Sequence, residues 1–325
     1  MKIAFVGKGG SGKTTLSSLF CRFLASQQLP VLAIDADINQ HMALALGMPE
    51  AEAVNVSPMG LEINRIKEYL RGDNIRIHSD GVMIKTTPPG TGSRLVRLLE
   101  DNPIYSYFQR QINGVRFMAT GPFSEDDLGT KCYHSKVGAI ELFLNHLVDG
   151  DHEYVVVDMT AGADSFASGM FTKFDITFVV VEPTLKSLSV YDQYKFYAKD
   201  YGVKLKVIGN KIEGLEDIEF IQSKVGDDYL TSFHKSNYVR KMERGEYLSL
   251  EQLEHENSAV LQVMRDEVNA TEKDWDRFYK YTVEFHIKNA QSWANATAGE
   301  DLTLQVDPNY NFRMESNSWL VKSSQ

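Results

Sequence analysis

The stretch Gly7-Lys8-Gly9-Gly10-Ser11-Gly12-Lys13-Thr14 decides the fold of this chain. It matches G-x-x-x-x-G-K-[ST], a loop whose backbone N–H groups surround the phosphates of a nucleotide. Residues 3–6 before it form an apolar run, which predicts a buried strand. Residues 15–24 after it predict a helix, because their apolar positions recur about every 3.6 residues. A strand, this loop and a helix in that order predict a phosphate-binding P-loop.

Glycine-rich sequence lets the backbone of such a loop approach an anion without steric clashes, at the positive end of the following helix. Lys13 is expected to reach the β- and γ-phosphates, and the Thr14 hydroxyl is expected to bind Mg²⁺. The residues that we expect to contact the nucleotide in this loop are Gly9, Gly10, Ser11, Gly12, Lys13, Thr14 and Thr15.

Further apolar runs predict strands at residues 31–34, 154–157, 176–181 and 203–208, with a helix at 185–201. Apolar strands that alternate with helices predict an α/β fold, a doubly wound and mainly parallel sheet with helices on both faces. Ligands of such sheets bind outside the carboxyl ends of the strands. Polar residues follow several of these strands directly, namely Asp35, Asp37, Asp158, Asn210 and Lys211.

Composition narrows the class of protein. The formal charge of -10 argues against a broadly basic surface that coats DNA. Two cysteines in 325 residues indicate no disulfide framework, as in a reducing cytosol. The first strand begins at once, which leaves no room for a signal peptide, and no apolar run reaches the ~20 residues that span a bilayer. We therefore expect a soluble cytoplasmic protein.

The chain divides by composition into residues 1–285, the expected nucleotide-binding domain, and a C-terminal extension, 286–325, rich in Asn, Ser, Thr and Gln. Within the first part, residues 50–125 have a mixed, turn-rich sequence and are interpreted as a variable insert. Residues 302–306 alternate like an edge strand. The extension is therefore either an ordered appendage or partly disordered.

A second lysine, Lys8, precedes the glycine pair of the loop. With it, the loop resembles the K-G-G-x-G-K-[ST]-T signature of the deviant Walker A ATPases, which include MinD, ParA, the nitrogenase iron protein, the arsenical-pump ATPase and CooC-type ATPases. In that family the early lysine reaches the phosphates of a partner subunit. The resemblance thus implies that ATP/ADP is the ligand, that Lys8, Lys13 and Asp37 are catalytic, and that the ATP state is a homodimer.

The resemblance also implies roles at the strand ends. Asp37 matches the aspartate that orients or activates the attacking water, and Asp35 matches the aspartate that lies near Mg²⁺. The alternative is that both are solvated carboxylates in a turn. Asp158 is similar to the Walker B aspartate that holds Mg²⁺, and residues 159–164 resemble the second switch.

Asn210 with Lys211 resembles an element that binds the adenine edge, although an Asn that caps a strand-end turn is equally compatible with the sequence. The family often has an Ile-Pro pair before its last base-contacting loop. Here Ser232-Phe233-His234 stands at that place, which leaves base contacts near Phe233 open.

One pair of residues bears on what the ATPase drives. CooC-type maturation ATPases carry a C-x-C pair that binds a metal across the dimer, and this chain has Cys132 and His134 at that place. Thiolate and imidazole both suit Zn²⁺ or another transition metal, and two chains would supply four ligands. The alternative is a buried cysteine beside a surface histidine.

The favoured hypothesis is an ATP-dependent dimer switch that serves metal-centre maturation or another client protein. A positioning or partition ATPase that acts on a surface is the alternative, but the acidic balance disfavours nucleic acid, and residues 316–322 are too short for a membrane-binding helix. A third hypothesis is a small-molecule P-loop kinase or ligase. The resemblance at Lys8 argues against it, because it ties that residue to dimer switching.

Overall fold

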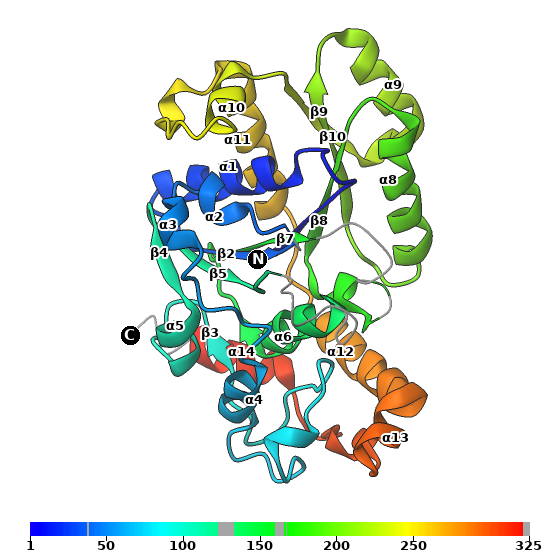
Figure 1. Ribbon diagram of the computed structural model, residues 1–325. Helices are drawn as coiled ribbons and strands as arrows, with labels where there is room; N and C mark the ends of the chain where they lie inside the picture. The colour runs from blue at the N-terminus through cyan, green and yellow to red at the C-terminus, as the bar shows by residue number, and fades with distance from the viewer. Residues whose placement is uncertain (38, 123–132, 160–165, 167, 321–325) are drawn as a thin grey trace.

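The computed structural model describes residues 1–320 except 38, 123–132, 160–165 and 167. A central eight-stranded sheet has the order β10-β9-β8-β1-β7-β2-β5-β4 (Figure 1). All neighbours pair in parallel except β4 and β5. Its strands are β1 (Lys2–Val6), β2 (Val31–Ala36), β4 (Arg110–Ile112), β5 (Val115–Ala119), β7 (Tyr154–Met159), β8 (Ile176–Val181), β9 (Leu205–Ile212) and β10 (Tyr229–His234). The predicted doubly wound α/β fold is confirmed.

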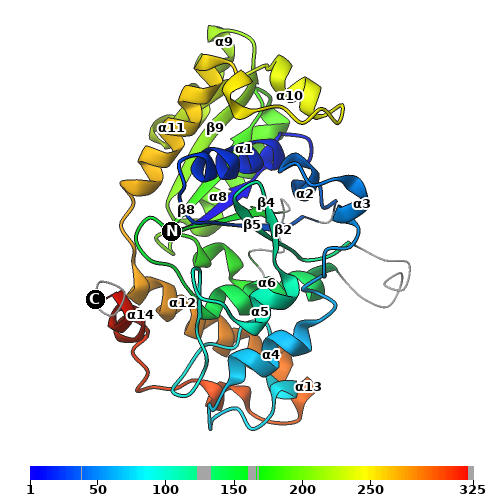
Figure 2. The same cartoon turned by 90° about the vertical axis from the view of Figure 1, so that its left-hand side faces the viewer.

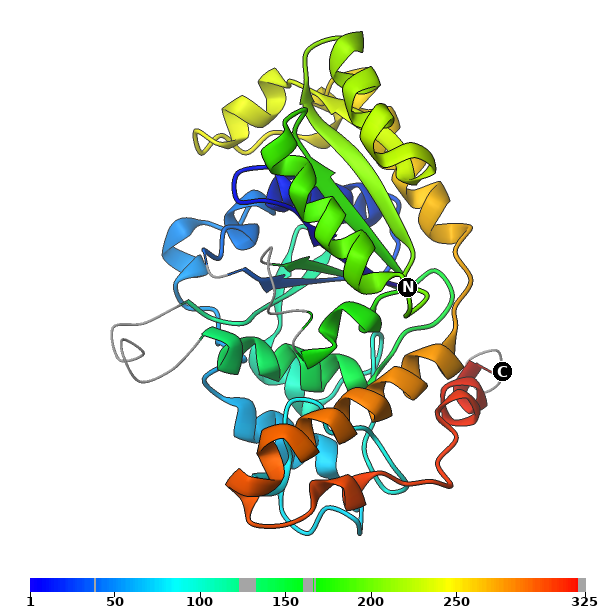
Figure 3. The same ribbon diagram turned by 90° about the vertical axis from the view of Figure 1, so that its right-hand side faces the viewer.

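Helices cover both faces of the sheet (Figures 2 and 3). One face packs against α1 (Lys13–Ser26), α2 (Met42–Ala45), α10 (Asn237–Met242) and α11 (His255–Asn269). The other packs against α6 (Tyr133–His146), α8 (Leu185–Ala198), α9 (Leu215–Val225) and α12 (Trp275–Asn289). Because the central strands are buried on both faces, β8 can be apolar at nearly every position, which made it easy to predict.

The sequence interpretation missed two strands of the main sheet. Residues 50–125, interpreted as a variable insert, contribute β4 and β5, and β5 pairs with β2. The rest of that range adds short helices and a strand, namely α3 (Glu50–Ala53), α4 (Ile63–Arg71), α5 (Pro103–Phe108) and β3 (Val96–Arg97). β3 pairs with β6 (Leu147–Val148) in a separate two-stranded sheet.

The predicted edge strand at residues 302–306 is wrong. Leu302–Gln305 is a short 3₁₀ helix whose preceding Asp301 accepts a hydrogen bond from the backbone N–H of Thr303 at 3.0 Å. Leu302 and Gln305 are buried while Leu304 is exposed, a pattern of three residues per turn. A strand would bury residues 302, 304 and 306 together, so the alternation of apolar and polar residues in the sequence did not predict which side chains are buried.

Residues 286–320 of the C-terminal segment form short helices and turns, part of which packs on residues 82–91 and forms with α4 a lower lobe (Figure 1). Helix α12 is continuous across residue 285, the predicted boundary, and leads into a π-helical turn, Ala290–Ala294. The remaining helices of the segment are α13 (Asn295–Ala298) and α14 (Phe312–Leu320). Thr87 donates to Gln305 Oε1 at 3.1 Å, and the backbone N–H of Thr91 donates to Asp307 at 3.1 Å.

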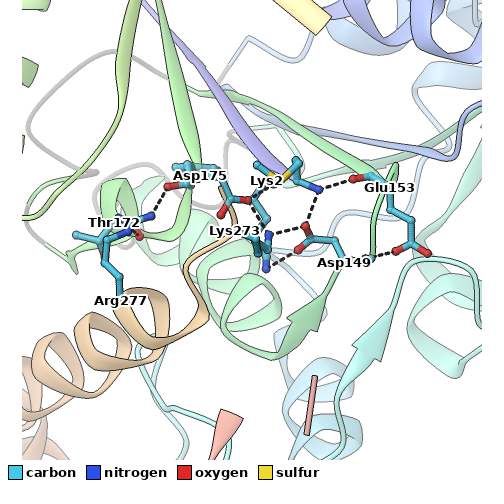
Figure 4. Close-up of polar contacts among 10 residues, drawn as sticks. Lys2, Asp149, Glu153, Thr172, Asp175, Lys273 and Arg277 are labelled. Carbon is cyan, nitrogen blue, oxygen red and sulfur yellow. Dashed lines mark hydrogen bonds and ion pairs between the residues drawn. The ribbon is translucent and has the colours of Figure 1, made fainter. Parts of the chain in front are cut away.

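A buried ion cluster fixes the amino end of β1 (Figure 4). Lys2 Nζ lies 2.8 Å from Asp149, and Lys273 Nζ lies 2.5 Å from Asp149 and 2.6 Å from Asp175. Burial alone would raise the pKa of Asp149, but Lys2, Lys273 and the amino group of Met1 hold that pKa well below its usual range. The cluster thereby joins β1 to the β6–β7 turn and to the start of α12.

We predict that Asp149→Asn destabilises the fold by about 3–5 kcal/mol, because Lys2 would keep a buried charge without its carboxylate partner. Urea unfolding measures the change. Asp151→Asn, at a solvent-exposed position, is the matched control and should stay within about 0.5 kcal/mol of the unmodified protein. An Asp149→Asn protein as stable as this control would contradict the prediction.

The same carboxylate predicts an acid dependence. The pKa of Asp149 in the folded protein lies below its unfolded value of about 3.9, so its contribution to stability is complete above that pH and lost as the pH falls below it. Between about pH 4 and pH 2, stability should fall more steeply in the unmodified protein than in Asp149→Asn. Parallel acid profiles would be the opposite result.

Candidate functional site

The glycine-rich loop lies between the carboxyl end of β1 and the start of α1. Gly12 is the N-cap of α1 and has a left-handed backbone with φ 93°. A side chain at this position would be strained, and its Cβ would lie 2.1 Å from Nδ2 of Asn210. The first N–H groups of a helix have no partners within the helix and point out of its amino end. Those of α1 therefore point toward the loop, as an anion site requires.

Two residues of β9 donate hydrogen bonds to backbone carbonyls of the loop. Asn210 Nδ2 donates to the carbonyl of Ser11 at 2.7 Å. Lys211 Nζ donates to the carbonyl of Gly10 at 2.7 Å and forms an ion pair with Glu182 at 2.6 Å. The sequence placed Asn210 and Lys211 beside the nucleotide, and the structure places them behind its phosphate loop. Whether Asn210 also binds adenine stays a prediction.

Lys13 forms an ion pair with Asp37 across 2.6 Å, and both side chains are nearly buried. Asp37 also accepts hydrogen bonds from the backbone and side-chain N–H groups of Asn39, at 3.0 Å and 3.2 Å. Burial raises the pKa of Asp37, but the bonds from Lys13 and Asn39 outweigh it, and the pKa is lowered. The loop lysine and the segment after β2 are thus held together by opposite charges.

Two buried carboxylates lie close to the Lys13–Asp37 ion pair. Asp35 and Asp158 are paired positions on β2 and β7, and Thr14 Oγ1 donates to Asp158 Oδ2 at 2.5 Å. Burial and the neighbouring Asp35 raise the pKa of Asp158 to about 8, and burial raises that of Asp35 to about 7. These carboxylates lie where a cation would stabilise their charged forms.

The residues present fit a magnesium ion. Asp158 Oδ1 is buried and has no hydrogen-bond partner within the described part of the chain, and the Thr14 hydroxyl lies beside the same carboxylate. Carboxylate and hydroxyl oxygens are ligands that Mg²⁺ prefers. Asp35, by contrast, uses both oxygens to accept backbone N–H groups, from Asp37 at 3.1 Å and Met42 at 3.0 Å. Asp35 therefore shapes the turn before α2, and its predicted place near Mg²⁺ stays a prediction.

A cavity of about 780 Å³ opens over the loop. Loop residues Gly9, Gly10, Gly12, Lys13, Thr14 and Thr15 line it together with Asp37. Its opposite wall comes from residues 44–50 and from α10 with the turn after it, including Met48, Val239, Met242 and Tyr247. A cavity of this size accommodates a small organic ligand.

The wall near Tyr247 could not be predicted, because it is formed by segments about 200 residues apart in the sequence. The Arg22 guanidinium carbon lies 4.9 Å from the centre of the Tyr247 ring, and a Cβ at Gly47 would lie 2.2 Å from that ring. Phe233 is 2% exposed and belongs to the core, so it is not part of this wall. Lys8 is half-buried at the start of the loop.

The predicted transition-metal pair is not tested. Cys132 lies outside the described residues, as do residues 160–164 of the predicted second switch, and His134 is described only as part of the first turn of α6. Over the part of the chain that the structure describes, no three His, Cys, Asp or Glu side chains are grouped to hold a metal ion. Nor does any described helix combine the length and apolar character needed to span a membrane.

A strand, a phosphate loop with its lysine, and carboxylates on the two neighbouring strands define a P-loop nucleotide-binding protein. The family described as the CobQ/CobB/MinD/ParA nucleotide binding domain matches residues 3–274. The chain belongs to this family.

Two relatives illustrate the range of the family. The carbon monoxide dehydrogenase accessory protein CooC of Rhodospirillum rubrum is 27% identical over 68% of this chain and 78% of its own length. An uncharacterised ATP-binding protein of Methanocaldococcus jannaschii is 29% identical over 70% of this chain and 81% of its own. The predicted resemblance to CooC-type and MinD/ParA-type proteins is confirmed at the level of the family.

Solved structures agree on the fold. The MinC:MinD cell division protein complex of Aquifex aeolicus has a TM-score of 0.53 at 19% identity, covering 84% of this chain and 97% of that chain. The septum site-determining protein MinD of Pyrococcus horikoshii, complexed with Mg-ADP, has a TM-score of 0.52 at 16% identity, covering 83% and 97%.

The Lys13–Asp37 ion pair makes a testable prediction about ligand affinity. A phosphate must draw Lys13 away from Asp37, so Asp37→Asn should bind ADP several-fold more tightly, a gain on the order of 1 kcal/mol. Titration calorimetry measures the dissociation constant. In a Lys13→Ala background the same substitution should bring a smaller gain, because the competing pair is already gone. Unchanged or weaker binding by Asp37→Asn alone would show that the pair does not compete with the ligand.

Proposed function

We propose that this protein is a Mg²⁺-dependent ATPase that works as an ATP-driven dimer switch on a client protein. The observation that carries the proposal is that Lys13, Thr14 and Asp37 line one cavity at the phosphate loop, while the buried Asp158 accepts a hydrogen bond from Thr14. Each has the side-chain chemistry that hydrolysis of a phosphoric anhydride needs.

The proposed chemistry follows from these positions. The loop N–H groups and Lys13 bind the phosphates and offset their charge. Thr14 and Asp158 would hold Mg²⁺, which neutralises charge on the β- and γ-phosphates when bound. Once Lys13 turns to the phosphates, Asp37 is free to orient a water for in-line attack on the γ-phosphorus. The Mg-ADP bound to the MinD structure, which shares the fold, supports this choice of ligand.

Homodimer formation is the part of the proposal that concerns Lys8. Its position before the glycine pair resembles that of the family lysine that completes a partner's site, and it stands at the open end of the loop where residues 9 and 10 are exposed. A lysine that contributes charge across two chains would link the ATP state to assembly.

This yields a test of the switch. With a non-hydrolysable ATP analogue the unmodified protein should become dimeric in light scattering, and Lys8→Ala should remain monomeric and lose ATPase activity by a factor of at least about 10². Lys13→Ala should bind the nucleotide itself more weakly. Lys224→Ala, at an exposed position on α9, is the control and should behave as the unmodified protein. Analogue-dependent dimers of Lys8→Ala would rule out the shared-site arrangement.

The proposed client is a metalloprotein under assembly. Support comes from the name of the relative CooC, an accessory protein of carbon monoxide dehydrogenase, and from Cys132 and His134 at the place of that family's metal-binding pair. Two chains would offer two thiolates and two imidazoles, a set that suits Zn²⁺ or another borderline metal.

Metal analysis of the purified dimer tests this part separately. We expect about one transition-metal ion per dimer in the unmodified protein and close to none in Cys132→Ser or His134→Ala, because two ligands do not hold such an ion firmly. Cys21→Ser, a buried cysteine in α1, is the matched control and should keep the metal. A stoichiometry far below one per dimer in the unmodified protein would contradict the shared metal site but leave the ATPase proposal intact.

A further inference from the structure

Gln40 combines two unfavourable features within the cavity wall. Its backbone is left-handed, with φ 50°, a conformation that residues other than glycine and asparagine seldom adopt. Its side-chain nitrogen Nε2 is buried and has no hydrogen-bond partner among the residues that the structure describes. Gln40 also lines the cavity, in the same segment as Asp37.

Both features cost free energy. A buried donor without an acceptor loses its hydration without compensation, and a left-handed non-glycine residue is strained. Such costs persist where the surroundings impose them, and they gather at sites that change conformation on binding. Gln40 is therefore a donor that lacks an acceptor in the structure as it stands.

The contacts around Gln40 show what holds it in place. The Lys13–Asp37 ion pair binds its segment to the phosphate loop, and Asn39 is bonded to the same carboxylate. On the other side, the N–H of Met42 donates to Asp35, which fixes the start of α2. Residues 39–41 thus span two anchors, one of which is the lysine that a phosphate would take.

We propose that Gln40 is a further catalytic residue, whose side-chain amide donates a hydrogen bond to the γ-phosphate of ATP. This proposal rests on the ATPase function proposed above. Phosphate binding draws Lys13 from Asp37 and releases one anchor, and the amide then gains a charged acceptor at the same end of the cavity. ADP has no γ-phosphate and leaves the amide without this partner.

The chemistry of glutamine suits this role. An amide N–H₂ donates without changing its protonation state, and bonds from it to a charged phosphate oxygen are stronger than bonds between neutral groups. The contact would strengthen as charge shifts during hydrolysis, when water attacks the γ-phosphorus and the bond to the β–γ bridging oxygen breaks. Gln40 would therefore both distinguish ATP from ADP and accelerate hydrolysis.

Substitutions that tolerate the left-handed backbone provide the test. Gln40→Gly removes the amide and relieves the strain, while Gln40→Asn keeps a shorter amide at a residue type that adopts positive φ. Gln40→Glu keeps the shape but replaces the donor with a negative charge. Thermal unfolding verifies that each variant folds.

Calorimetry with ADP and with a non-hydrolysable ATP analogue, together with ATPase rates at saturating ATP, gives the readout. For Gln40→Gly and Gln40→Glu we expect the affinity for the analogue to fall about ten-fold or more and kcat to fall at least as much, with the dissociation constant for ADP within about two-fold of the unmodified value. Gln40→Asn should lie between them and the unmodified protein.

Two results would overturn the proposal. An equal loss of affinity for ADP and for the analogue would show that Gln40 only supports the shape of the cavity, and unchanged analogue affinity and kcat in Gln40→Gly would show that it has no role.

If the unmodified protein bound neither nucleotide, the ATPase function would fail first and this proposal with it. Nucleotide binding that depends on Lys13 but not on Gln40 would remove this proposal alone.

Discussion

The contact between Lys13 and Asp37 joins the two parts of the site that must act together. Lys13 belongs to the phosphate loop after β1, and Asp37 to the segment after β2, two strands away across β7. A lysine side chain can pair closely with the carboxylate or with a phosphate, but not fully with both. An anion that bound Lys13 would therefore break its pair with Asp37 and release the segment that precedes α2. The fold makes this possible because it brings the carboxyl ends of parallel strands to one edge.

The charges around this contact are unbalanced. Asp35, Asp37 and Asp158 lie near Lys13, and burial raises the pKa of Asp35 and Asp158 more than Lys13 lowers it. A site with this excess of carboxylates is better suited to a phosphate that brings a divalent cation than to a free phosphate. On the function proposed above, the acidic strand ends would favour a nucleotide that carries Mg²⁺.

The sequence predicted those parts of the site that depend on local pattern. Lys13, Thr14, Asp37 and Asp158 could be identified because each occupies a fixed position relative to an apolar strand. Contacts between distant segments could not be found in this way. The bond from Asn210 to the loop carbonyl and the wall near Tyr247 arise from packing across about 200 residues of sequence.

The predicted fold class is correct, but individual elements were mispredicted for physical reasons of their own. β5 was missed because it has five residues, one of which is the charged Arg116, so its apolar run does not stand out from the mixed sequence around it. Residues 302–306 were predicted as a strand because their apolar and polar residues alternate in the sequence, but the 3₁₀ turn buries Leu302 and Gln305 and exposes Leu304. The unpaired donor of Gln40 has no signal in the sequence at all, since it is defined by what surrounds the side chain.

The lower lobe has a consequence for how the chain acquires its structure during synthesis. Residues 82–91 are made early, and Val82 and Thr87 also contact nearer segments. The apolar surface of Val82 and Ile84 that packs against residues 290–302, however, gains those partners only once the end of the chain has been made, as do the bonds from Thr87 and Thr91 to residues 305 and 307. Contacts between such distant segments form late, after the intervening chain has been ordered. While the ribosome is still adding the second half of the protein, this apolar surface stays uncovered and is open to wrong associations. Assembly of the lobe is therefore expected to be among the last steps of folding, although its first residues emerge before most of the sheet.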